Sequence, residues 1–349
     1  MTLKAPFPYF GGKSTIAHLV WERFGRVNNY VEPFFGSGAV LLKRPPPFGV
    51  ETVNDADGMV CNFWRAVAKD PEGVAKYADW PVDECSLHAR HIWLVGQKES
   101  LQARLEGDPD YFDVKIAGWW CWGMCCWIGH GFCSGIGPWH VEDGKLVDGG
   151  SGGVWKQVPY LRGAGQGMNS QGTRRKLPHL GDAGKGINRQ RVHLADNGKG
   201  IHSQQALIYE WMQDLSERLR RVRVCCGDWS RITGPSVTIQ HGLTGVFLDP
   251  PYSDEAARDM TLYTKDCGKV AHDARAWCIE WGEHPLMRIA LCGYEGEHEM
   301  PKTWECVAWK ANGGYAGQAK DECAPGLANR TRERIWFSPN CLKPELNLL

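Results

Sequence analysis

Short apolar runs alternate with amphipathic helical patterns at the two ends of the chain, and this alternation constrains the fold most. The expected strands are residues 29–32, 50–53, 222–226, 245–248, 288–292, 304–309 and 334–337. Two amphipathic helices, 204–221 and 271–282, separate some of the later strands. The apolar stripe expected on the first consists of Leu207, Trp211, Leu215 and Leu219. Strands that alternate with helices form a mainly parallel sheet covered on both faces. The sequence therefore predicts an α/β fold.

A glycine-rich turn follows the first expected strand, at residues 32–38 (Glu-Pro-Phe-Phe-Gly-Ser-Gly). Glycines between a strand and a helix let the backbone approach a ligand. Leu41 stands where a complete dinucleotide-binding fingerprint would need a third glycine. The second strand ends at Asn54-Asp55, where an acidic side chain can bind ribose hydroxyls. The turn and Asp55 together indicate a ligand site at the strand ends.

Helices are expected after both of these strands. The apolar run 39–42 (Ala-Val-Leu-Leu) predicts a helix start behind the glycines. A second helix is predicted after Asp55, with Val60, Phe63, Trp64 and Val67 on one face.

The motif Asp249-Pro250-Pro251-Tyr252 directly follows the apolar strand 245–248. A polar residue at the carboxyl end of such a strand lies where α/β sheets bind ligands. The two prolines stiffen the turn and remove two N–H donors, which leaves a carboxylate and carbonyl acceptors together. This arrangement suits an amino group, and the tyrosine adds a flat face on which a planar base can stack. An ordinary proline-rich turn is the simpler alternative.

The segment 58–203 divides the α/β pattern and has a different composition. The chain as a whole is neutral, but residues 151–204 contain nine Lys or Arg and two Asp. Three short repeats there carry Gly-Gln-Gly or Gly-Lys-Gly, typical of loops that approach phosphates or of a surface insertion. A neutral chain with one basic segment suits an enzyme that docks an anionic polymer at one place. The candidate DNA-binding residues are Arg174, Arg175, Lys176, Arg189 and Arg191.

Cysteine usage and the chain start indicate a cytoplasmic protein with reduced thiols. The first ten residues lack a secretory pattern, and no apolar run is long enough to cross a membrane. The densest cysteine group, at 121–133, lacks the paired Cys-x-x-Cys spacing of a zinc site, so these residues are expected to pack in the core. No metal is expected. The run Gly12-Lys13-Ser14 is not a phosphate loop, because Phe7 stands where that pattern needs glycine.

A series of motifs runs in one order through the two end regions of the chain. They are Pro8-Tyr9-Phe10-Gly11-Gly12-Lys13, Glu32-Pro33-Phe34-Phe35-Gly36-Ser37-Gly38, Asn54-Asp55, Gly227-Asp228, Asp249-Pro250-Pro251-Tyr252 and the tail Arg332-Glu333-Arg334-Ile335-Trp336. This series resembles the Dam-type family of adenine-specific DNA methyltransferases, over roughly residues 1–67 and 203–340.

The resemblance implies a class I S-adenosylmethionine-dependent methyltransferase fold, with a mainly parallel seven-stranded sheet. Residues 1–57 and 204–349 would form the catalytic domain, and 58–203 an inserted target-recognition region. The implied substrate is double-stranded DNA, without an obligatory protein partner or a membrane. The familiar pattern of the insert is absent at 122–127, where the chain reads Trp-Gly-Met-Cys-Cys-Trp. No nuclease motif is visible, which favours a solitary or phage-type modification enzyme.

The resemblance also implies roles for individual residues. Asp249 and the carbonyl of Pro250 would accept the two hydrogens of the amino group of a flipped-out adenine, and Tyr252, after Pro251, would stack on the base. Phe7 and Lys13 would hold the amino-acid end of the methyl donor, and Asp55 its ribose. Asp228 would bind the adenine amino group of the donor. The full set implied to bind the donor is Phe7, Gly11, Lys13, Glu32, Pro33, Phe34, Gly36, Gly38, Asp55 and Asp228.

Several other activities compete with this interpretation. Methylation of a cytosine ring carbon needs a Cys nucleophile, usually in Pro-Cys, and the sequence has no Pro-Cys pair. Methylation of the cytosine N4 amino group is the closest rival, although its usual motif is Ser-Pro-Pro-Tyr. Methylation of RNA or of protein glutamine usually replaces the aspartate by asparagine, and an oxidoreductase would need the third glycine. A catalytically silent DNA-binding module stays open as a different class.

Overall fold

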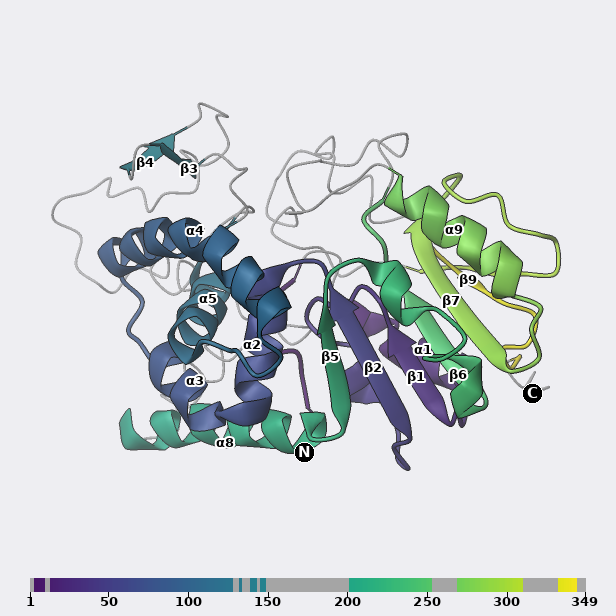
Figure 1. Cartoon of the computed structure of the whole chain (residues 1–349), viewed down its shortest axis with the longest axis horizontal. Helices are drawn as coiled ribbons and strands as arrows, with labels where there is room; N and C mark the ends of the chain where they lie inside the picture. The colour runs from purple at the N-terminus through teal and green to yellow at the C-terminus, as the bar shows by residue number, and fades with distance from the viewer. Residues whose placement is uncertain are drawn as a thin grey trace, which may run out of the picture.

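The computed structural model describes residues 3–9, 13–127, 132–133, 139–142, 145–148, 201–252, 269–309 and 332–343. Its centre is a sheet of seven strands in the order β5-β2-β1-β6-β7-β9-β8 (Figure 1). The strands are β1 (Asn29–Glu32), β2 (Val50–Asp55), β5 (Val222–Cys226), β6 (Thr244–Leu248), β7 (Met287–Tyr294), β8 (Glu305–Ala308) and β9 (Glu333–Phe337).

The first five strands of this order are parallel, and the last two run differently. β1 pairs in parallel with both β2 and β6, and β2 with β5 and β6 with β7 likewise. β9 is antiparallel to both β7 and β8. The predicted α/β fold is confirmed, and the mostly parallel seven-stranded sheet is consistent with a class I methyltransferase fold.

Helices cover both faces of the sheet, as alternate residues of β7 demonstrate. Ile289 and Leu291 pack on one side with Ala274 and Cys278 of α9 (Val270–Trp281). Ala290 and Cys292 belong to the other core. That core is formed largely by α1 (Ala17–Phe24), α2 (Gly58–Lys69), α3 (Pro71–Ala78), α4 (Glu84–Gly107), α5 (Val114–Cys126) and α8 (Ile201–Leu219). Buried strands with apolar residues on both faces are expected for a parallel sheet.

Aspartates begin four of these helices and explain where the helices start. The side chain of Asp57 accepts a hydrogen bond from the backbone N–H of Met59, and Asp70, Asp83 and Asp113 cap α3, α4 and α5 in the same way. Such caps satisfy backbone donors that the first helical turn leaves unpaired. The predicted apolar face of α2 is also observed, because all four of its expected residues are buried.

Two local predictions are wrong in detail. The run 39–42 does not start an α-helix; the chain forms only a short 3-10 turn, η2 (Leu41–Lys43), because Arg44 is extended before Pro45. A residue that precedes proline is disfavoured in helical conformation. The buried stripe of α8 consists of Ile208, Met212, Leu215 and Leu219. Leu207 and Trp211, expected in that stripe, lie half-buried at its border because α8 packs against both α2 and α3.

The helices α2 to α5 share one core with the sheet. α2 contacts β2, β5 and α5, while α3 packs on α5 and α8 (Figure 1). A small hairpin of β3 (Trp139–Glu142) and β4 (Lys145–Asp148) follows these helices. The division into residues 1–57 with 204–349 and an insertion 58–203 stays a prediction. None of the helices in the described part of the chain is long and apolar enough to cross a membrane.

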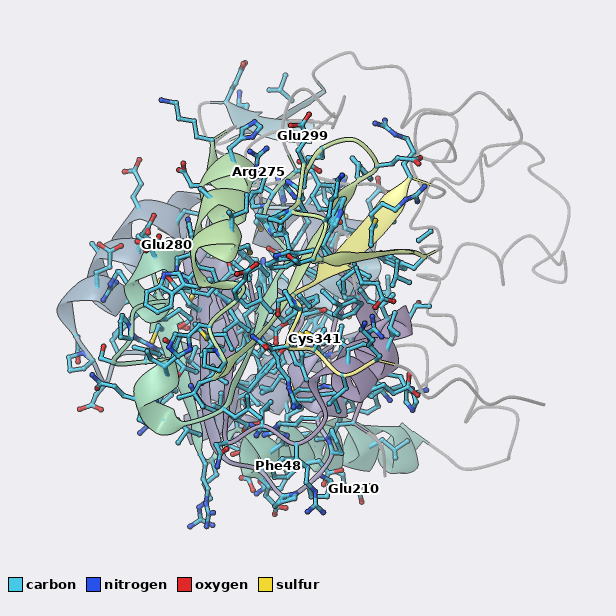
Figure 2. The ribbon with its side chains drawn as sticks, turned by 90° about the vertical axis from the view of Figure 1, so that its right-hand side faces the viewer. Phe48, Glu210, Arg275, Glu280, Glu299 and Cys341 are labelled. Atoms are coloured by element: carbon cyan, nitrogen blue, oxygen red, sulfur yellow. The ribbon has the colours of Figure 1, made fainter. Side chains whose placement is uncertain are left out.

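The molecular surface carries a few large apolar side chains outside these cores. Figure 2 shows Phe48 at the end of the molecule where α8 lies, and the guanidinium of Arg218 on α8 covers its ring at 4.1 Å. Glu280 extends from the outer side of α9, opposite the buried Ala274 and Cys278.

Candidate active site

The sequence motifs meet at the carboxyl ends of β1, β2, β5 and β6. After β1 the chain adds β2 and β5 on one side of it, and then crosses to place β6 on the other side. In open α/β sheets, ligands bind outside the carboxyl ends of the strands, at the point where the strand order reverses in this way. A cavity of about 380 Å³ lies there, lined by residues from all four strand ends. This volume falls in the range of small-molecule sites, roughly 300–1,000 Å³.

The loop after β1 brings bare backbone to the wall of this cavity. Gly36 and Gly38 have positive φ angles of 47° and 67°. A Cβ atom added to Gly36 would lie 2.7 Å from Cδ1 of Tyr9, so only glycine fits without movement. The loop is held from behind by the indole N–H of Trp64, which donates to the carbonyl of Gly36 at 2.9 Å. The backbone is therefore fixed where a ligand can approach it closely.

Asp55 fixes this loop to the end of β2. Its Oδ2 accepts a hydrogen bond from the backbone N–H of Gly36 at 2.8 Å, and Oδ1 accepts one from Asp57 at 2.9 Å. Burial raises the pKa of Asp55 to about 6, against the lowering effect of these N–H groups. The neighbouring amide of Asn54 donates to the carbonyls of Pro33 and Gly227 at 3.2 and 3.0 Å, which joins two loops of the site.

The loop after β5 supplies an acidic and an aromatic side chain. Asp228 caps η4 (Trp229–Ile232), and its Oδ1 accepts from the backbone N–H of Ser230 at 2.9 Å. The ring of Trp229 lies 5.9 Å from the ring of Phe34, at an angle of 31° between their planes. Both rings line the cavity together with Asp228. An aromatic pair beside a carboxylate can hold a flat heterocycle that carries hydrogen-bond donors.

Asp249 and Tyr252 follow β6 and meet Lys13 of η1 (Lys13–Thr15). The ammonium of Lys13 lies 3.0 Å from Oδ1 of Asp249 and donates to the hydroxyl of Tyr252 at 3.1 Å. The lysine is only 4% exposed, and the aspartate side chain 16%. Burial raises the pKa of Asp249 to about 6, although Lys13 opposes this shift. The carboxylate of Asp249 is thus partly buried and more basic than an ordinary aspartate, which suits it to accept hydrogen bonds.

Glu32 adds a further acid beneath the cavity. It is buried, and its Oε2 accepts a hydrogen bond from the hydroxyl of Tyr30 at 2.8 Å. Burial raises the pKa of Glu32 well above its ordinary value, and the nearby charge of Asp249 adds to the rise. Among the described residues, six carboxylate side chains line the cavity beside a single lysine, Lys13; the six are Glu32, Asp55, Asp57, Glu106, Asp228 and Asp249.

Residues 9–84 match the family model of the D12 class N6 adenine-specific DNA methyltransferases. The match indicates an adenine-specific DNA methyltransferase. The matched segment includes Lys13, β1, the glycine loop and Asp55, so it forms one wall of the cavity. The matched segment ends before β6 and the Asp249 motif. No curated protein matches the chain.

Most of the residues expected to bind the methyl donor lie at this cavity, with some exceptions. Phe7 is completely buried and packs against the rings of Phe63 and Trp120, at 5.1 and 4.7 Å between centroids. Gly38 is enclosed by Phe35 and Trp64. Gly11 lies outside the described residues, and so do the candidate DNA-binding residues, which are Arg174, Arg175, Lys176, Arg189 and Arg191.

The cysteines at 121–133 pack in the hydrophobic core. Cys121, Cys125, Cys126 and Cys133 are all buried. The thiol of Cys125 lies 3.6 Å from the carbonyl oxygen of Pro6. Within the described residues, no group of three or more His, Cys, Asp or Glu is arranged to hold a metal ion.

Several side chains of the site were not predicted from the sequence, among them the lining carboxylates Asp57 and Glu106. Tyr9 and Trp229 line the cavity, and both stand inside or beside motifs that were recognised. An aromatic residue directly after Asp228 was a usable signal, because flat ligands stack on such rings. Glu333 accepts a hydrogen bond from the Tyr252 hydroxyl at 2.7 Å. Glu333 stands in the tail motif 332–336, but nothing in that motif assigns it to the site, because its contact with Tyr252 depends on the return of β9 beside β7.

Proposed function

We propose that the chain transfers a methyl group from S-adenosylmethionine to the N6 amino group of an adenine flipped out of duplex DNA. The family match supports methylation of adenine in DNA. The observation that carries the finer proposal is the position of Asp249: it lines the same cavity as the Gly36 loop, directly after strand β6, which pairs with β1. A donor site and an acceptor for an amino group therefore adjoin.

The composition of the cavity fits S-adenosylmethionine. When bound, this donor supplies an electrophilic methyl group on a positively charged sulfonium. The excess of carboxylates over Lys13 favours such a cation, since opposite charges attract strongly in a partly buried site. Phe34 and Trp229 would enclose the donor's adenine, with Asp228 accepting from its amino group and Asp55 from the ribose. The backbone of Gly36 would admit the amino-acid portion.

Asp249 would act on the target base. The amino lone pair of adenine is delocalised into the ring and is a poor nucleophile. By accepting the two amino hydrogens, the carboxylate of Asp249 and the carbonyl of Pro250 would localise that lone pair on nitrogen. This is catalysis by alignment and by placed acceptors, without a covalent intermediate on the protein. Pro251 stiffens the turn, and the ring of Tyr252 would stack on the base.

The target adenine must leave the double helix to reach Asp249, because an amino group inside a duplex is inaccessible. Flipping costs a few kcal/mol of lost stacking and pairing, which stacking on Tyr252 would partly offset. We assign the grip on DNA to the inserted region 58–203, on the strength of its basic stretch at 151–204.

The test is replacement of Asp249 by asparagine, which keeps the size of the side chain and removes its charge. We expect methyl transfer to fall by about 10- to 100-fold, since a hydrogen bond to a charged group contributes roughly 1.5–3 kcal/mol. Binding of S-adenosylmethionine, measured by calorimetry, should change little. The matched control is Asp214→Asn on the exposed side of α8.

The product decides the activity. Duplex DNA treated with the wild-type protein is digested to nucleosides and analysed by mass spectrometry. N6-methyladenosine in its deoxy form is expected; N4-methylcytosine or no modified nucleoside would refute the proposal. Full transfer by the Asp249→Asn variant would refute the role of Asp249 alone.

A further inference from the structure

Glu333, the first residue of β9, is a buried carboxylate at the proposed site. It is 6% exposed and pairs across the sheet with Tyr294 of β7. Its Oε2 accepts the hydrogen bond of the Tyr252 hydroxyl at 2.7 Å. The same Tyr252 ring lies edge-on against Tyr294, with 4.4 Å between ring centroids. Glu333 thus contacts Tyr252 from β9, the antiparallel strand next to β7.

The Tyr252 hydroxyl lies between two carboxylates. Glu333 Oε2 is 2.7 Å from it, and Asp249 Oδ1 is 3.5 Å away. A hydroxyl has a single hydrogen to donate, and 3.5 Å is long for an O–H···O contact. The hydrogen therefore points to Glu333. The hydroxyl oxygen meanwhile accepts from Lys13, which also pairs with Asp249 at 3.0 Å.

We propose that Glu333 is a positioning residue for methyl transfer: by holding the hydrogen of the Tyr252 hydroxyl, it keeps Asp249 available to accept the amino hydrogens of the target adenine. This inference rests on the function proposed above. Without an acceptor at 333, the hydroxyl would turn its hydrogen to Asp249. It would then compete with the adenine amino group for the carboxylate.

Loss of Glu333 would change the pKa of Asp249 in two ways, and both lower it. It faces Lys13 from η1, Glu32 from β1, Cys292 from β7 and Glu333 from β9. Burial raises the pKa of Asp249, and the negative charge of Glu333 raises it further while Lys13 lowers it. Loss of the charge at 333 therefore lowers the pKa of Asp249. A hydroxyl that donates to Asp249 would lower it too, because that bond stabilises the carboxylate.

This role differs measurably from that of a residue that only fills a buried position. Damage to packing lowers activity and leaves the acid limb of the pH profile in place. Loss of Glu333 as a positioning residue lowers the turnover at neutral pH and moves the acid limb to lower pH. The lower turnover reduces activity at every pH, whereas the shifted acid limb preserves a larger fraction of that activity at low pH. General destabilisation does not produce this combination.

The experiment compares Glu333→Gln, which keeps an acceptor but removes the charge, with Glu333→Leu, which removes both. Each is also made with Tyr252→Phe, a change that keeps the ring and deletes the hydroxyl. The control is Glu295→Gln, a nearby exposed glutamate that pairs with Arg334. Measured quantities are kcat and KM for duplex DNA between pH 5 and 8, the Kd of S-adenosylmethionine and the melting temperature.

We expect kcat at pH 7.5 to fall about ten-fold in Glu333→Gln and further in Glu333→Leu, since a neutral acceptor is weaker than a charged one. The acid limb should move to lower pH, with the donor Kd within about two-fold of wild type. In the Tyr252→Phe background, Glu333→Leu should cause no further fall in kcat, because there is no hydroxyl hydrogen left to redirect. Glu295→Gln should behave as wild type.

Three results would overturn the inference. They are an unchanged kcat and acid limb in both Glu333 variants, an undiminished effect of Glu333→Leu when the hydroxyl is absent, or loss of folding in Glu333→Gln as well as in Glu333→Leu. A wild-type protein that does not methylate adenine would overturn the proposed function, and this inference with it. An active wild type with unaffected Glu333 variants would refute the inference alone.

Discussion

Replacing Gly36 with alanine is expected to lower the free energy of unfolding and to weaken donor binding together. Gly36 has φ near 47°, in the left-handed region where a side chain costs roughly 1–2 kcal/mol. The new Cβ would also lie 2.7 and 2.8 Å from two carbons of the Tyr9 ring. Real Cβ atoms do not approach so closely, so the loop or the ring must move.

Movement of the Gly36 loop would change the position of Asp55, which we propose binds the ribose of the donor. The N–H of Gly36 donates to Asp55 at 2.8 Å, and its carbonyl accepts from Trp64 at 2.9 Å. A displacement that breaks the first of these bonds releases the carboxylate from its position. A hydrogen bond to a charged group is worth about 1.5–3 kcal/mol, which corresponds to a ten-fold or greater rise in the donor Kd.

Calorimetry with S-adenosylmethionine and denaturant unfolding measure the two effects of Gly36→Ala. The matched control is Gly96→Ala, in the exposed interior of α4, where an added Cβ meets no atom within 4 Å. That change should stabilise the protein by about 0.5–1 kcal/mol and leave the donor Kd unchanged. If Gly36→Ala behaved like Gly96→Ala, the loop would have room for a side chain and our account of it would be wrong.

Three further predictions concern the donor, the base and the DNA. Asp55→Ala should raise the donor Kd about ten-fold or more by calorimetry, and an unchanged Kd would leave Asp55 as a turn residue only. Because the pKa of Asp249 is raised to about 6 and the ionised form is the acceptor, kcat/KM should fall as the pH drops below about 6; a profile flat to pH 5 would contradict this. Replacing Arg174, Arg175 and Lys176 together by alanine should weaken DNA binding at all sequences. It should also flatten the log–log salt dependence by about 0.9 for each phosphate that the protein no longer neutralises, whereas identical salt titrations would exclude phosphate binding by these residues.

Every predicted strand of the main sheet is present. The central strands β6 and β7 are buried, nearly continuous apolar runs, which are visible in the sequence itself, although β7 is longer than the predicted 288–292 and runs from Met287 to Tyr294. The run 39–42 is equally apolar but forms only the short 3-10 turn η2 and no α-helix, because Pro45 follows it so closely. The α8 stripe is shifted because tertiary packing, against α2 and α3 together, selects which of several apolar residues are buried.

The site divides in the same way between local and long-range features. Asp55 ends a strand, and Asp228 and Asp249 closely follow one. Parallel strands bring their ends together, so the proximity of these residues could be predicted. Phe7 stands in a recognised motif, but its side chain lies in the aromatic core. Glu333 belongs to the tail motif 332–336, but its contact with Tyr252 could not be predicted, because only the antiparallel pairing of β9 with β7 brings the two side chains together.

The pairing of Lys13 with Asp249 explains why the proposed chemistry needs an acceptor from the backbone as well. One oxygen of Asp249 already lies 3.0 Å from the Lys13 ammonium, so an arriving amino group shares this carboxylate with a cation. The carbonyl of Pro250 is a second acceptor whose position the two prolines hold rigidly. A backbone carbonyl has no charge to be titrated, so it accepts equally well on either side of the raised pKa of Asp249. In the proposed mechanism, the carboxylate therefore sets the pH dependence of the reaction, while the proline carbonyl sets the orientation of the amino group.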